Sequence, residues 1–268
     1  MLKMTRRALM AAVAVMPLMT WAASAEGLIS IIVTDPANPY WFTEGEVAKA
    51  TAEGMGYTAN VSAHKGDTNA ESTLIDTAIT NKSVAIILDP ANADGSIGAV
   101  KKAIAAGIPV FLVNAEINEE GLAKAQLVSN NAQGAAMGAE QWVAMVGETG
   151  TYVELFGNPA DNNAATRSND YETVISQYPD LVKAGKLDAV KVGGIDGSPD
   201  AVAAVKSGEM QYTVLQPVAV FSAEAVRQAD NFIKTGSTGA ATEKQLFDCL
   251  LITKDNVDKY TAAFTLSE

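Results

Sequence analysis

The stretch 28–42, "LISIIVTDPANPYWF", joins an apolar run to a polar turn and then to three consecutive aromatic residues. Residues 28–33 predict a buried strand, and residues 43–53 have helical character and end at Gly54, so the stretch opens a β-α unit. The aromatic turn either plugs a hydrophobic core or forms the wall of a small-molecule site. Ligands of open α/β sheets bind beyond the carboxyl ends of the strands, so its position favours the wall.

Strands and helices of this kind alternate along the first half of the chain. The expected strands are 28–33, 57–61, 84–88, 109–113 and 126–128. The expected helices are 43–53, 70–80, 96–106 and 119–124. Repeated β-α units with nearly continuous apolar strands predict a parallel sheet that is covered by helices on both faces.

The alternation restarts after an expected helix at 131–146, which indicates a second β-α layer. Further strands are expected at 151–156, 190–195 and 212–215, and further helices at 164–176, 200–207 and 222–234. This second layer is lopsided, because it has only three strands where the first half has five. The join "YPDLVKAGKLDAV", residues 178–190, links two β-α units abruptly through one short helix-like tract.

The first 25 residues are typical of a secretory signal peptide. Lys3, Arg6 and Arg7 form a basic start, an apolar stretch follows at 8–21, and Ala23-Ser24-Ala25 is an A-x-A cleavage site. The sequence therefore predicts a mature protein that begins at Glu26 and is soluble outside the cytoplasm.

The mature chain is strongly acidic. The whole sequence carries 19 basic and 31 acidic residues, and removing the three basic residues of the signal peptide leaves 16 against 31, a net charge of −15. Such a balance argues against nucleic acid and anionic membrane surfaces as partners. The single cysteine, Cys249, excludes an internal disulfide framework and is expected to be buried and inert in the apolar run 246–252.

Enzymatic signals are weak. His64 is the only histidine, and no second histidine or further cysteine completes a metal site with it, so a surface or supporting role is expected. The sequence has no nucleophile elbow, no phosphate-binding loop and no dinucleotide fingerprint after a strand. We therefore expect no catalytic residue, no metal and no cofactor, although a pair of glycosidase carboxylates is not excluded by counting.

Polar clusters follow several of the expected strands, at 34–38, 89–94, 114–118, 158–163 and 196–200. Sugars have CH faces that stack on aromatic rings, and hydroxyls that bind Asp, Asn, Gln and Arg side chains. Arg167 follows one of these clusters in a chain that is poor in basic residues. A surface ion pair between Arg167 and Asp170 is the alternative.

The order of four segments resembles the periplasmic sugar-binding proteins of ABC importers, of the ribose-binding type. The segments are "IIVTDPANPYWF" (31–42), "GIPVFLVNAE" (107–116), "NNAATRSNDYE" (162–172) and "GGIDGSPDAVAAVKSGEMQYTVLQP" (193–217). The resemblance runs over almost the whole mature chain. It implies two Rossmann-like lobes with parallel sheets, joined by three crossings, that close on one monosaccharide and deliver it to a membrane permease.

Carried over by position, the resemblance assigns ligand contacts to eight residues. These are Thr34, Asn38, Tyr40, Trp41, Asn114, Arg167, Asp196 and Gln216. Tyr40 and Trp41 are the expected stacking faces, and Phe42 is expected to anchor the loop. Asn114 stands where the family usually has Asp, and Ala115 where it has Arg, which shifts the expected ligand towards a smaller or acyclic polyol such as a sugar alcohol.

The resemblance also implies the division of the chain and its partners. The first lobe would comprise 26–129 plus 217–252, and the second 130–216 plus 253–268. The protein would be a monomer that binds a sugar or polyol and docks on an ABC permease of the inner membrane. A receptor that passes a sugar-like signal to a sensor is an alternative, and a secreted glycoside-acting enzyme is a further one.

The largest departure from the family is a gap near 178–190, which explains the abrupt join. The resemblance implies that a strand, a helix, a second strand and most of a helix are missing. Judged from the usual near-equality of the two lobes in the family, this is roughly forty residues or more. The loss of central strands should expose apolar sheet edges. We therefore expect a destabilised second lobe and a reduced affinity for ligand, unless a partner or a rearrangement covers the gap.

Overall fold

The computed structural model describes residues 26–159, 161–178, 180–183 and 191–267. The expected signal peptide and part of the join at 178–190 lie outside these residues. Within them, no helix is both long enough and apolar enough to cross a membrane.

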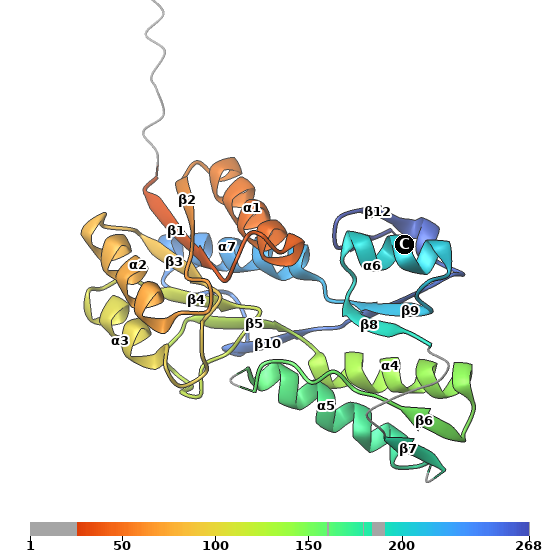
Figure 1. The fold of residues 1–268 in the computed structure, drawn as a ribbon. Coiled ribbons are helices and arrows are strands. Elements are labelled where there is room, and N and C mark those ends of the chain that lie inside the picture. Colours follow the sequence, from red (N-terminus) through yellow and green to blue (C-terminus); the bar gives the residue numbers. More distant parts are fainter. Residues whose placement is uncertain (1–25, 160, 179, 184–190, 268) are drawn as a thin grey trace, which may run out of the picture.

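The first half of the chain, together with a later segment, builds a six-stranded parallel sheet (Figure 1), which with its helices we call the first lobe. Its strand order is β10-β5-β4-β3-β1-β2. The strands are β1 (Leu28–Val33), β2 (Thr58–Ala63), β3 (Ala85–Leu88), β4 (Val110–Val113), β5 (Ala125–Ser129) and β10 (Lys244–Phe247). The helices are α1 (Pro39–Gly54), α2 (Thr68–Thr80), α3 (Ile97–Ala105) and α7 (Val218–Thr235).

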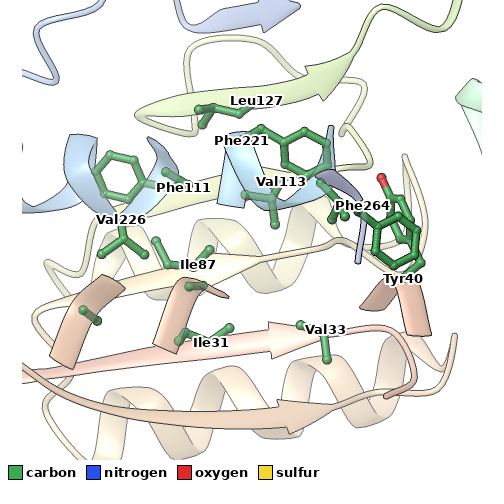
Figure 2. Packing of buried hydrophobic residues seen from close by; sticks show 14 of the residues in the cluster. Ile31, Val33, Tyr40, Ile87, Phe111, Val113, Leu127, Phe221, Val226 and Phe264 are labelled. Carbon is green, nitrogen blue, oxygen red and sulfur yellow. The ribbon is translucent and has the colours of Figure 1, made fainter. Parts of the chain in front are cut away.

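Alternate side chains of these strands enter two separate cores, because successive residues of a strand point to opposite faces. Ile31 packs in the core beneath α1 and α7, with Phe221 of α7 fully buried there (Figure 2). Its neighbour Ile32 packs in the second core, with Ile75 of α2 and Val100 of α3. The parallel sheet covered on both faces is therefore confirmed.

The described strands of the second lobe form three small sheets. Strands β8 (Gly193–Asp196), β9 (Tyr212–Leu215) and β11 (Leu250–Thr253) form one sheet in the order β11-β9-β8. Strands β6 (Gly150–Tyr152) and β7 (Leu181–Lys183) form a separate parallel pair (Figure 1). The lobe also contains α4 (Asn131–Val146), α5 (Asn162–Ile175), α6 (Pro199–Ser207), the 3-10 turn η1 (Val257–Lys259) and the hairpin strands β12 (Tyr260–Ala262) and β13 (Thr265–Leu266).

The structure corrects four details of the sequence analysis. Residues 119–124 form turns and bends rather than a helix, and Gly121 has the positive φ of +83° that interrupts a helix. The strand expected at 151–156 ends at Tyr152, where its pairing with β7 ends. Strands β10, β11, β12 and β13 were not expected. The join at 178–190, expected to be one short helix-like tract, contains strand β7. Residues 250–252 pair antiparallel with β9, and the expected division of the chain into two lobes stays a prediction.

The split sheet predicts that the two lobes differ in local stability. Amides of β3 and β4 lie in the middle of a six-stranded sheet, whereas β6 belongs to a two-stranded pair. Two-stranded ribbons are marginal by themselves. We expect amides 150–152 to exchange with deuterium at least about tenfold faster than amides 86–88 in native-state hydrogen exchange measured by NMR. Equal protection of the two segments would contradict this assignment of stability.

Candidate functional site

A buried carboxyl group, Asp89, lies where three neighbouring strands of the first lobe end. Thr34 follows β1, Asp89 follows β3 and Asn114 follows β4. The Thr34 hydroxyl donates to Oδ2 of Asp89 at 3.0 Å, and Nδ2 of Asn114 donates to the same oxygen at 3.2 Å. Parallel neighbours end at the same sheet edge, and this brings the three side chains together.

The environment of Asp89 favours the neutral carboxyl. Its side chain is 1% exposed. Burial raises the pKa of Asp89 to about 7, although the hydrogen bonds from Asn114 and Thr34 oppose the shift. His64 supports the same loop: its Nδ1 accepts from Gly66 N–H at 3.0 Å, so Nε2 carries the proton and donates to the Asp89 carbonyl oxygen at 2.8 Å. His64 is 1% exposed, so the expected supporting role fits and a surface role does not.

In the aromatic turn at residues 40–42, the side chain that is buried in the core is not the one that was expected. Tyr40 is 4% exposed and its ring packs edge-on against Phe264 at a centroid distance of 5.4 Å. Tyr40 is thus part of the core, while its hydroxyl donates to Oδ1 of Asn114 at 3.1 Å. Phe42 is 53% exposed, so the expectation that it anchors the loop is wrong. The anchor is Tyr40.

Asn38 and Trp41 hold other positions around the same turn. The Asn38 side chain accepts from Tyr40 N–H at 2.9 Å and caps the N-terminus of α1. Trp41 packs on the first core with its ring edge-on to Tyr40, at 6.5 Å between centroids. Its Nε1 is buried and has no hydrogen-bond acceptor among the described residues. Buried indole N–H groups usually have a partner, so this donor is a feature that a ligand hydroxyl would satisfy.

A chain of amides connects the second lobe to the first. Arg167 of α5 donates from its guanidinium to Oδ1 of Asn131 at 2.7 Å. Nδ2 of Asn131 donates to Oδ1 of Asn163 at 2.9 Å, and Nδ2 of Asn163 donates to the Asn114 carbonyl oxygen at 2.9 Å. Arg167 also lies 3.8 Å from Asp161, rather than pairing with Asp170. These contacts span the two lobes at the ends of their strands.

Asp196 and Gln216 are the remaining predicted contacts, and they lie at the ends of β8 and β9. Nε2 of Gln216 donates to Oδ1 of Asp196 at 2.5 Å. Burial and then the charge of Asp196 raise the pKa of Tyr40, so Asp196 lies within electrostatic reach of the first lobe. Asp196 has φ +88° and Asn114 has φ +63°. Left-handed backbone is uncommon outside glycine, and strained residues of this kind concentrate at binding sites.

The structure therefore unites most of the predicted contacts but not all. Thr34, Tyr40 and Asn114 share one network, Arg167 joins it through amides, and Asp196 pairs with Gln216. Three participants were not singled out from the sequence, namely Asp89, Asn131 and Asn163. Asp89 and Asn163 belong to polar clusters that follow expected strands, and this position could have identified them. Asn131 is the first residue of a helix, and nothing in the sequence around it indicates a site.

A cavity of about 640 Å³ adjoins this network in the second lobe. Arg167 and Ile195 line the cavity, together with aromatic side chains that include Trp142, Tyr171 and Tyr212. Its volume lies within the range of small-molecule sites. Among the described residues, no group of three or more His, Cys, Asp or Glu side chains could hold a metal ion.

The fold is that of periplasmic binding proteins, and the chain belongs to that family. Residues 29–183 match the family model described as a periplasmic binding protein domain. The chain is 41% identical to the D-apiose import binding protein of Paraburkholderia graminis, over 90% of this chain and 91% of the relative. It is 38% identical to the protein of the same name from Actinobacillus succinogenes, over 93% of this chain and 95% of the relative.

Solved structures agree on the fold. An ABC transporter solute binding protein from Bacillus halodurans, solved with bound myo-inositol, superposes with a TM-score of 0.79 at 19% identity. The superposition covers 89% of this chain and 98% of the other. The family consists of substrate-binding proteins of transport systems rather than enzymes, and it is a periplasmic family.

The alignment with the Paraburkholderia protein also gives the number of its positions that this chain lacks. It spans 286 positions, whereas 90% of this 268-residue chain is about 241 residues, so about 45 positions of the relative have no counterpart here. The same reasoning gives about 49 positions for the Actinobacillus protein, from 298 positions and 93% of this chain. The match to the family model ends at residue 183, within the join at 178–190 where the gap is expected.

The raised pKa of Asp89 predicts a pH dependence of stability. Between about pH 4 and pH 7 the folded protein keeps a proton on Asp89 that the unfolded chain has released, so this group lowers stability as the pH rises through that window. The quantity to follow is the difference in melting temperature between the two proteins, wild type minus Asp89→Asn. We expect this difference to fall by roughly 2 °C or more from pH 5 to pH 7.5. Thermal unfolding followed by circular dichroism measures it.

Two features make this comparison specific. Glu44 is present in both proteins, so the rise of its pKa that comes from burial cancels in the difference. Only the smaller rise that comes from the charge of Asp89 is lost in the variant. The matched control is Asp76→Asn on the exposed surface of α2, which should leave the pH trend of the wild type in place. A difference for Asp89→Asn that stays constant or grows with pH would show that Asp89 is ionised in the folded state at pH 5.

Proposed function

We propose that this chain is the substrate-binding component of an ABC importer and that it binds D-apiose or a monosaccharide of similar size between its lobes. The names of its two relatives at 41% and 38% identity support the sugar. The mature protein would begin at Glu26 after cleavage of the signal peptide, act as a monomer in the periplasm, and deliver the sugar to a permease of the inner membrane.

The observation that carries the proposal is the network at the meeting of the lobes. It contains the carboxyl groups of Asp89 and Asp196, the amides of Asn114 and Gln216, and the guanidinium of Arg167. Sugar hydroxyls both donate and accept, so they match such a mixed set of donors and acceptors. In the described part of the chain, Oε1 of Gln216 is buried without a hydrogen-bond partner, which provides one acceptor for a hydroxyl.

Isothermal titration calorimetry of residues 26–268 with D-apiose, D-ribose, myo-inositol and glycerol tests the proposal. We expect D-apiose to bind more tightly than the other three. The gap in the second lobe should weaken binding relative to the Paraburkholderia protein measured in parallel. The absence of heat with all four ligands at millimolar concentration, from a protein that is folded by circular dichroism, would argue against a sugar-binding role.

Substitution of Arg167, which contributes the guanidinium of the network, tests the proposal at a single residue. Arg167→Ala should weaken sugar binding by roughly ten- to a hundredfold, since hydrogen bonds to a charged group contribute about 1.5–3 kcal/mol. The control is Arg227→Ala, which removes an exposed guanidinium of α7 that pairs with Glu224. It should bind like the wild type. Equal affinities for both variants would place the sugar away from Arg167.

A further inference from the structure

The cavity in the second lobe and the network at the meeting of the lobes share a residue. Arg167 belongs to both, because its guanidinium donates to Oδ1 of Asn131 at 2.7 Å and its side chain lines the cavity. Ala135 of α4 also lines the cavity, four residues after Asn131. Residues four apart on a helix lie on the same face, so α4 turns one face towards the network and the cavity.

Two further residues of the network have a chain neighbour in the cavity wall. Ala164 of α5 lines the cavity and follows Asn163, which accepts from the Asn131 amide. Ile195 of β8 lines the cavity and precedes Asp196, which accepts from Gln216. The cavity and the network are therefore adjacent along three elements, α4, α5 and β8. A ligand that is held by the network can extend into the cavity.

The wall of the cavity is aromatic. Trp142 of α4, Tyr171 of α5 and Tyr212 of β9 line it, and Phe156 lines it with a side chain that is 53% exposed. Aromatic rings pack by stacking or edge to face on other flat rings. The Nε1 atom of Trp142 is buried and has no acceptor among the described residues, although buried indole N–H groups usually have one. The lining therefore suits a flat aromatic group that carries an oxygen atom.

The size of the cavity exceeds the size of a single small sugar. A pentose has about ten non-hydrogen atoms, which fill about 300 Å³ if each takes the share of a water molecule in the liquid. The cavity has a volume of about 640 Å³. It has room for a second group of similar size even if the sugar were placed wholly inside it, and more room if the network holds the sugar outside.

We infer that the substrate is an aryl glycoside, with its sugar held by the network and its aromatic aglycone in the cavity. The inference rests on the proposed function, because the network must hold the sugar before the aglycone can reach the cavity. Arg167 lies where the two parts of the ligand meet, and the Trp142 indole donates to an oxygen of the aglycone. An aromatic compound without a sugar would contact the cavity but none of the polar groups of the network.

Isothermal titration calorimetry of residues 26–268 with methyl and phenyl D-apiofuranosides, each as both anomers, tests the inference. The two glycosides differ only in the ring. We expect one phenyl anomer to bind at least about tenfold more tightly than its methyl counterpart, because the ring is removed from water. Binding of D-apiose with no advantage for either phenyl glycoside overturns the inference and leaves the proposed function in place. If neither D-apiose nor any glycoside binds, both are overturned.

Substitutions at two half-exposed positions locate the aglycone. Phe156→Ala removes an aromatic side chain of the cavity wall, and it should reduce the advantage of the phenyl over the methyl glycoside at least about threefold. Leu246→Ala, at a 55% exposed position of β10 in the first lobe, is the control and should keep the advantage of the wild type. Equal losses in both variants, or phenol that binds as tightly as the phenyl glycoside, would place the ring elsewhere and overturn the inference.

Discussion

Parallel pairing is the constraint on which the rest of this structure depends. Strands β1, β3 and β4 are parallel neighbours, so their carboxyl ends lie side by side and their terminal polar residues meet. That arrangement places the Thr34 hydroxyl and the Asn114 amide on one buried carboxyl group, Asp89. The position of the binding network thus follows from the direction of the strands.

The same constraint explains why the second lobe is vulnerable to a shortened sequence. A parallel strand reaches its neighbour only through a crossover of a dozen or more residues, so a strand and its helix are lost together. The described residues of the lobe form three small sheets, and one cavity is lined by residues that follow β6 and by residues of β8.

The sequence predicted most elements, because their patterns are local. The helix at 131–146 and the strand at 28–33 have the same bounds in the structure as in the prediction. The errors came from interactions that are not local. Strand β10 carries no distinctive pattern and forms because β5 offers it an edge, and the strand expected at 151–156 is shortened because β7 pairs with only three of its residues. The gap was visible in the sequence as an abrupt join.

For the candidate site, the chain positions could be predicted but the roles could not. Residue type and place at a strand end indicated Thr34, Asn114 and Asp196 as polar residues at the ends of strands. Whether a ring stacks on a ligand or fills a core depends on packing from distant residues. Tyr40 is buried because Phe264, more than two hundred residues later, packs against it. Asp89 lies at the centre of the network because β3 lies between β1 and β4, and the sequence alone does not give that strand order.

The single cysteine has a practical consequence. Cys249 lies where the chain passes from β10 in the first lobe to β11 in the second, and it is 3% exposed. Burial raises the pKa of its thiol to about 12, so at neutral pH almost none of it is the reactive thiolate. A cysteine introduced on the surface of either lobe could therefore carry a maleimide dye while Cys249 stays in place. The molecule can be made into an optical reporter of lobe movement with a single substitution.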